Sequence, residues 1–143
     1  MPQYATIQDF ERAFTEEEAV ALSNLNKPEA TVVDAEVLNE ALVNASAEID
    51  SYLRARYSLP FAIVPQELVP HCLSISRYRL TSYDPSDDVR QRYEDSVRWL
   101  EQVARGLAIL DVPAPEQEVV QGVGMPQYCA PGRIFTHSSL GGY

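Results

Sequence analysis

The pattern of apolar and polar positions predicts an all-α fold whose central element is one long helix. Between residues 35 and 57, apolar side chains recur at intervals of three and four, the spacing that places them on one buried face of a helix. Asp34 precedes this stretch as a capping residue, and Arg54 and Arg56 fall where cations complement the helix dipole. The buried face comprises Leu38, Leu42, Ala45, Ile49, Tyr52 and Leu53, and the polar face comprises Glu40, Asn44, Glu48 and Ser51.

Two short helices are predicted before the long one. A Ser/Thr-x-x-acid pattern, in which side chains bond the free amide groups of a helix's first turn, occurs twice. It is formed by Thr6 with Asp9 and by Thr15 with Glu18. The Asn- and Pro-containing stretch that follows is expected to form a loop. The two helices are expected to end at Phe14 and Ser23.

A fourth helix is predicted after a break at residues 58–61, because Pro60 cannot continue the helical hydrogen-bond ladder. This helix should cover residues 66–82, with Pro65 suited to its first turn. Pro70 should either kink it or mark its true start. Its apolar positions are Leu73, Ile75, Tyr78 and Leu80.

A fifth helix is predicted over residues 87–105. Ser86 can cap its start, and Gly106 can end it because glycine tolerates the left-handed conformation. The three longer helices should form a rigid bundle, with the interface between neighbouring copies built from their polar faces. The predicted buried positions of the fifth helix are Val89, Tyr93, Val97, Leu100 and Ala104.

The helical pattern ends near Val112. The last 32 residues hold five of the six glycines and four of the ten prolines. The chain therefore divides into a helical domain, residues 1–111, and an extended C-terminal arm, residues 112–143. Large apolar residues near the end of the arm are unusual in a plain linker and indicate contact with a partner. The candidate partner-binding residues are Arg133, Ile134, Phe135, Leu140 and Tyr143.

The charge balance disfavours binding to free nucleic acid. The chain carries 21 acidic and 11 basic residues, a net charge of −10, and 11 of the acidic residues fall in the first 60 positions. Such a surface repels phosphates, although it suits a channel through which DNA slides without adhering. No apolar stretch reaches the roughly 18 residues of a membrane span, and no signal-peptide pattern opens the chain, so we expect neither membrane contact nor secretion.

No catalytic or metal-binding pattern stands out. His71 and Cys72 are neighbours on a predicted helix, so their side chains diverge and do not favour a shared metal or a thiolate pair. Cys129 and His137 lie in the arm, which lacks the rigid surroundings that catalysis needs. The acidic runs at residues 16–18 and 87–88 fit helix first turns. We expect no cofactor, no metal and no enzymatic activity.

Several short stretches carry a family resemblance through their order and spacing. They are residues 4–6 (YAT), 45–53 (ASAEIDSYL), 56–57 (RY), 59–60 (LP), 77–80 (RYRL), 92–95 (RYED), 99–100 (WL), 133–135 (RIF) and 140–143 (LGGY). On these stretches the chain resembles the Mu-like phage family of small head-to-tail joining proteins. The middle of the arm, residues 113–131, departs from that pattern, which leaves the partner of the arm open.

The resemblance implies a helical bundle of the phage connector adaptor type and a structural role in the virion neck. It implies a ring of identical subunits around the DNA channel, with the portal protein on one side and neck or tail proteins, such as the stopper or terminator, on the other. DNA would pass through the lumen without specific binding, and assembly would occur in the host cytoplasm. These expectations rest on family analogy.

A second hypothesis comes from a different class. A small acidic helical protein can act as a regulator, mimicking DNA or sequestering a basic partner. Such a protein would bind one partner at fixed stoichiometry and would be absent from virions. Enzymatic activity is the least favoured hypothesis, because the sequence shows no converging set of nucleophile, general base and oxyanion donor.

Overall fold

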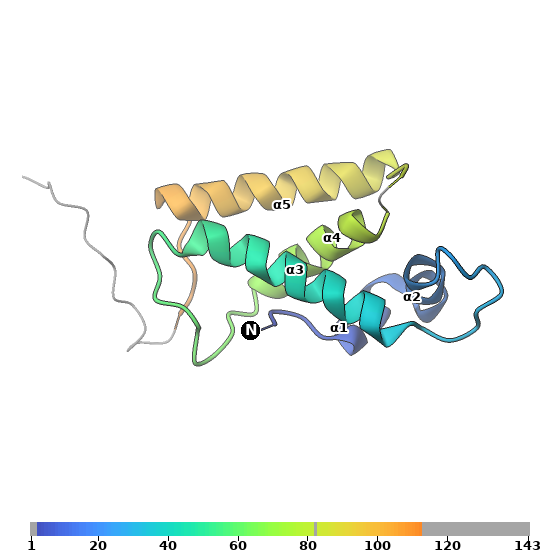
Figure 1. Cartoon of the computed structure of the whole chain (residues 1–143). Helices are drawn as coiled ribbons and strands as arrows, with labels where there is room; N and C mark the ends of the chain where they lie inside the picture. The colour runs from blue at the N-terminus through green and yellow to red at the C-terminus, as the bar shows by residue number, and fades with distance from the viewer. Residues whose placement is uncertain (1–2, 82, 113–143) are drawn as a thin grey trace, which may run out of the picture.

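The computed structural model describes residues 3–81 and 83–112, and every regular element among them is an α-helix (Figure 1). This confirms the predicted all-α class. The helices are α1 (Ile7–Phe14), α2 (Glu16–Ser23), α3 (Ala35–Leu53), α4 (Leu68–Leu80) and α5 (Asp87–Arg105).

The two N-terminal helices follow one another without a linker, as predicted. Thr6 and Asp9 form a reciprocal capping box at the start of α1. Thr15 ends α1 by donating its backbone amide to the Glu11 carbonyl, and its side chain accepts from the Glu18 amide to open α2. Thr15 has a φ of 75°, a conformation that costs a β-branched residue roughly 1–3 kcal/mol. The chain therefore turns sharply between α1 and α2.

Helix α3 begins after Asp34 as predicted, but it ends at Leu53 and not at residue 57. The Arg56 and Tyr57 amides both donate to the Leu53 carbonyl, at 2.9 Å each, so the chain tightens into a turn. Tyr57 is buried, and its hydroxyl accepts a hydrogen bond of 3.1 Å from the Leu110 amide. Burial of this tyrosine under a distant segment, rather than local propensity, sets the end of the helix.

Helix α4 is shorter at both ends than the predicted span of 66–82. Residues 66–67 form a turn in which the Leu68 amide donates to the Pro65 carbonyl at 3.1 Å. Pro70 is the third residue of α4, where its missing amide proton breaks no helical bond, so it marks the start and not a kink. The helix ends at Leu80.

Helix α5 matches the predicted span of 87–105, with Ser86 and Gly106 as its caps. Its buried face differs in part from the predicted one. Ser96 and Val103 are buried in place of the predicted Val97 and Ala104, which are half-buried. Among the buried positions, Val89, Ser96 and Val103 are seven residues apart and Leu100 lies four after Ser96, a pattern that suits one narrow seam against α4 and α3.

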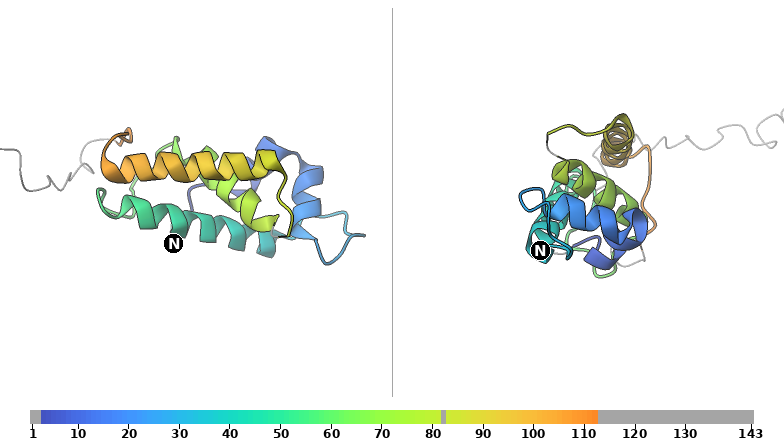
Figure 2. Two further views of the ribbon diagram at one scale, coloured as in Figure 1. Left: turned by 90° about the horizontal axis from the view of Figure 1, so that it is seen from above. Right: turned by 90° about the vertical axis from the view of Figure 1, so that its right-hand side faces the viewer.

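Helices α3, α4 and α5 form the body of the domain, and α1 and α2 cover part of α3 and α4. Helices α3 and α5 run in the same direction, with α4 between them (Figures 1 and 2). The α2–α3 loop and the α4–α5 turn therefore lie at one end, and the α3–α4 loop and residues 106–112 lie at the other. The largest fully buried side chains are Phe10, Leu38, Leu42, Ile49, Leu53, Leu68, Ile75, Leu100 and Leu110.

Candidate interaction surfaces

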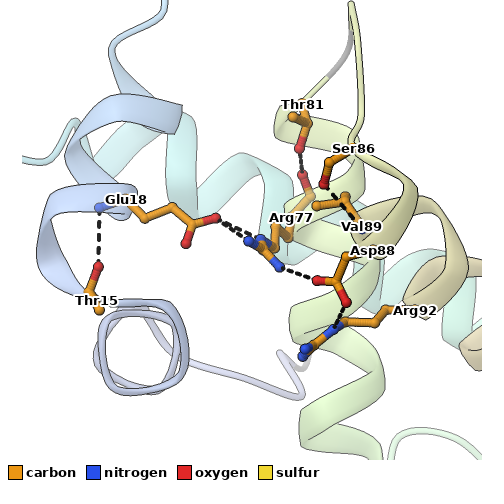
Figure 3. A network of polar contacts seen from close by, with 8 residues as sticks. All are labelled: Thr15, Glu18, Arg77, Thr81, Ser86, Asp88, Val89 and Arg92. Atoms are coloured by element: carbon orange, nitrogen blue, oxygen red, sulfur yellow. Dashed lines mark hydrogen bonds and ion pairs between the residues drawn. The ribbon is translucent and has the colours of Figure 1, made fainter.

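Arg77 of α4 joins three helices (Figure 3). Its Nε and Nη2 atoms both bond Glu18 Oε1 of α2, at 2.7 and 2.6 Å, and its Nη1 atom lies 3.5 Å from Asp88 Oδ2 of α5. The guanidinium also stacks 4.6 Å from the centre of the Phe14 ring of α1. Because only 17% of the Arg77 side chain is exposed, these contacts are partly shielded from water. Arg77 therefore fixes α1, α2 and α5 relative to α4.

A second polar cluster surrounds Glu48 of α3. Arg79 Nη2 lies 2.6 Å from Glu48 Oε2, and the Tyr93 hydroxyl donates to Glu48 Oε1 at 3.0 Å. The Tyr93 ring stacks on Tyr78 with centroids 4.1 Å apart. Burial, helped by the adjacent Glu48 carboxylate, raises the pKa of Tyr93 to about 12. Glu48 was predicted on the exposed polar face, but it is only 15% exposed because α4 and α5 pack over it.

The N-terminal segment is anchored in the core. Tyr4 is buried, its hydroxyl donates to Asp50 Oδ1, and its amide donates to Ser46 Oγ at 3.1 Å. Burial and the neighbouring Asp50 carboxylate raise the pKa of Tyr4 well above its ordinary value. The segment before α1 is therefore part of the helical domain.

His71 and Cys72 point to different helices, as predicted. The His71 ring stacks on Trp99 of α5 at 4.1 Å, and its Nδ1 lies 3.1 Å from Ser96 Oγ. Cys72 is buried against α3, with Sγ 3.6 Å from Ser46 Oγ. Burial lowers the pKa of His71 and raises that of Cys72. Within residues 3–81 and 83–112, no three His, Cys, Asp or Glu side chains are grouped to hold a metal ion.

Several of the family-like stretches among the described residues contact one another in space. Tyr4 of the YAT stretch bonds Asp50 in residues 45–53, and Glu48 of that stretch bonds Arg79 of RYRL and Tyr93 of RYED. All of these residues except the exposed Arg79 are partly or fully buried, and together they connect α3 to α4, α5 and the N-terminal segment. The resemblance is thus carried by the framework of the domain.

Among residues 3–81 and 83–112, seven large apolar side chains are exposed, and these seven lie at the two ends of the domain. One group belongs to the α2–α3 loop, the first turn of α3 and the α4–α5 turn; the other belongs to the α3–α4 loop and the segment after α5. Their exposed fractions are Leu25 57%, Val32 74%, Val37 39% and Tyr83 99% in the first group, and Ile63 62%, Leu107 77% and Ile109 73% in the second.

These exposed apolar positions were not predicted from the sequence as interaction residues. They stand in or beside connectors, where no periodicity marks a buried face, so the only signal was an apolar residue among turn-forming neighbours. The predicted partner-binding residues, Arg133, Ile134, Phe135, Leu140 and Tyr143, lie outside the described residues.

Comparison with known proteins places this small helical domain among phage proteins. The family model described as Bacteriophage Mu, Gp36 matches residues 4–125. Mu-like prophage FluMu protein gp36 of Haemophilus influenzae is 38% identical over 116 residues, which cover 81% of this chain and 82% of that protein. Gene product J of Escherichia phage Mu is 31% identical over 138 residues, 96% of this chain and 97% of that protein. The chain belongs to the Gp36 family of phage Mu and Mu-like prophages.

No helix among residues 3–81 and 83–112 is both long enough and apolar enough to cross a membrane.

Proposed function

We propose that this protein is a structural component of the virion, a head-to-tail connector adaptor that joins the portal to the neck and tail proteins. The observation that carries the proposal is the match to gene product J of Escherichia phage Mu along nearly the full length of both chains. The short stretches that resemble head-to-tail joining proteins, such as residues 45–53 and 77–80, lie mainly within residues 4–125, the region that the family model matches.

The geometry supports a rigid structural component. Hydrogen bonds and an ion pair between family-like residues connect the N-terminal segment and three helices. These residues are Tyr4, Asp50, Glu48, Arg79 and Tyr93. Hydrogen bonds between charged groups are stronger than neutral ones, and partial burial reduces their screening by salt. An adaptor between head and tail needs a domain that keeps its shape while its surfaces engage neighbours.

The charge supports a position around the DNA channel. In the proposed ring of identical copies, a surface with a net charge of −10 per chain would repel DNA phosphates and let DNA pass without adhering. The C-terminal arm would contact the portal or a neighbouring stopper or terminator protein through Arg133, Ile134, Phe135, Leu140 and Tyr143. The protein would assemble in the host cytoplasm and remain in the neck.

The proposal is tested by a stop codon placed early in the gene of the phage that encodes this chain. Electron microscopy of the lysate should show DNA-filled heads and complete but unattached tails, and supplying the full chain from a plasmid should restore joined particles. Joined, infectious particles made without the protein would contradict the proposal. Loss of head assembly itself would place the protein at a different step.

A further inference from the structure

The two ends of the domain carry complementary surfaces. We call the α2–α3 loop with the first turn of α3 and the described residues of the α4–α5 turn, residues 24–37, 81 and 83–88, the acidic end. We call residues 54–67 and 105–112 the arginine end. The exposed apolar side chains are Leu25, Val32, Val37 and Tyr83 at the acidic end, and Ile63, Leu107 and Ile109 at the arginine end.

The charges at the two ends have opposite tendencies. The acidic end holds six acidic residues and one basic residue, whereas the arginine end holds three arginines and two acidic residues. Arg54 and Arg105 are exposed, and so are Glu29 and Asp84. Charges arranged in this way attract one another across an interface and select its partner.

Helix capping explains only part of this arrangement. Because α3 and α5 run in the same direction, both N-termini lie at the acidic end and both C-termini at the arginine end (Figures 1 and 2). The helix dipole favours acids at the first and arginines at the second. Glu29 and Asp84, however, lie outside the helices, and no dipole requires Val32, Tyr83, Leu107 or Ile109 to be apolar. Exposed apolar groups at both ends indicate surfaces that become covered.

We infer that the acidic end of one copy docks on the arginine end of the next copy. This inference rests on the proposed ring and deepens it, because it names the surfaces that join the subunits. An interface between two different surfaces of identical chains propagates head to tail, and it closes into a ring when the rotation per subunit allows. The apolar side chains would form the centre of the interface, with the charged groups at its rim. The interface would thus use the ends of the helices and not the polar faces that were expected from the sequence.

Charge reversal tests the inference in the full-length protein. One variant carries Glu29→Arg and Asp84→Arg, a second carries Arg54→Glu and Arg105→Glu, and a third carries all four changes. Self-association is measured by sedimentation velocity at low salt over a concentration series. Each two-site variant should associate at least about tenfold more weakly than the wild type, because like charges then meet. The four-site variant should recover to within a few-fold, since its ends are complementary again.

A matched pair of single substitutions compares one arginine away from both ends with one at the arginine end. The two substitutions are Arg98→Glu and, as its counterpart at the arginine end, Arg105→Glu alone; Arg98 is exposed on α5 between the two ends, and each substitution makes the same charge change. The Arg98→Glu control should associate as the wild type does, whereas Arg105→Glu should associate more weakly. Circular dichroism and thermal melting of every variant separate lost association from lost folding.

Thiol cross-linking gives the geometry directly. In a Cys129→Ser background, one preparation carries Val32→Cys and another carries Ile109→Cys. Mixing the two and oxidising them should give mainly the mixed disulfide dimer. Wild-type protein that stays monomeric at millimolar concentration, two-site variants that associate normally, or cross-linking between like ends would each overturn the inference. Absence of the chain from tailed particles would instead overturn the proposed function. The sedimentation and cross-linking measurements use purified protein, so their results do not depend on whether the chain is part of the virion.

Discussion

Replacing Arg77 by alanine tests whether the charged contacts of α4 hold the N-terminal helices in place. The substitution removes the two bonds to Glu18, the weaker contact with Asp88 and the stacking on Phe14. A charge-assisted hydrogen bond contributes about 1.5–3 kcal/mol and an exposed cation–π contact about 0.5–1 kcal/mol. Glu18 is 31% exposed and regains water when its partner is lost, which reduces the cost. We therefore expect the free energy of unfolding to fall by about 2–3 kcal/mol.

Urea denaturation followed by circular dichroism measures this change, with Arg92→Ala as the control. Arg92 makes one ion pair with Asp88, at 3.1 Å, but its side chain is 57% exposed. Its removal should cost less than about 1 kcal/mol, as for exposed ion pairs in general. Arg77→Lys should fall between the two alanine variants, because a single ammonium cannot bond both groups and cover the ring. An Arg77→Ala variant as stable as Arg92→Ala would refute the role assigned to this network.

Three further predictions concern local features of the helical domain. Ser86→Ala should lower the free energy of unfolding by about 1 kcal/mol in urea titrations, because the α5 N-cap that accepts from the Val89 amide is lost. Burial lowers the pKa of His71 below its ordinary value of 6.5, so the unfolded state binds more protons and stability should fall as the pH drops below about 6.5; His71→Gln should show a shallower fall across the same pH series. In a Cys129→Ser background, Cys72 should react with Ellman's reagent far more slowly in native protein than in urea, because burial raises the pKa of its thiol.

Features set by neighbouring residues could be predicted from the sequence. The caps at Thr6, Thr15, Asp34 and Ser86 act within three residues of themselves, and the structure confirms each of them. Helical periodicity likewise predicted the three longer helices and most of their buried faces, because a face repeats at fixed intervals along the chain.

Features set by contacts between distant residues could not be predicted. The end of α3 depends on Tyr57, whose hydroxyl meets the Leu110 amide 53 positions later. Glu48 has the spacing of an exposed residue, yet Arg79 and Tyr93 converge on it from 31 and 45 positions away. Periodicity describes one helix at a time and contains no information on which helices cover a polar side chain.

The surfaces at the two ends of the domain likewise could not be predicted from the sequence. The exposed residues Val32, Tyr83, Leu107 and Ile109 have no periodic pattern, and only the parallel course of α3 and α5 gathers them at two opposite ends. The arm residues predicted to bind a partner, from Arg133 to Tyr143, stay a prediction.

Quantitative mass spectrometry of purified tailed particles tests the central claim most directly. The number of copies of this chain per particle is measured against the number of portal subunits, using isotope-labelled peptides from both proteins as standards. A neck adaptor ring that sits on the portal predicts a fixed and stoichiometric copy number, equal to that of the portal in the simplest arrangement. Absence of the chain from intact, joined particles would contradict the adaptor role and favour a regulator that acts outside the virion.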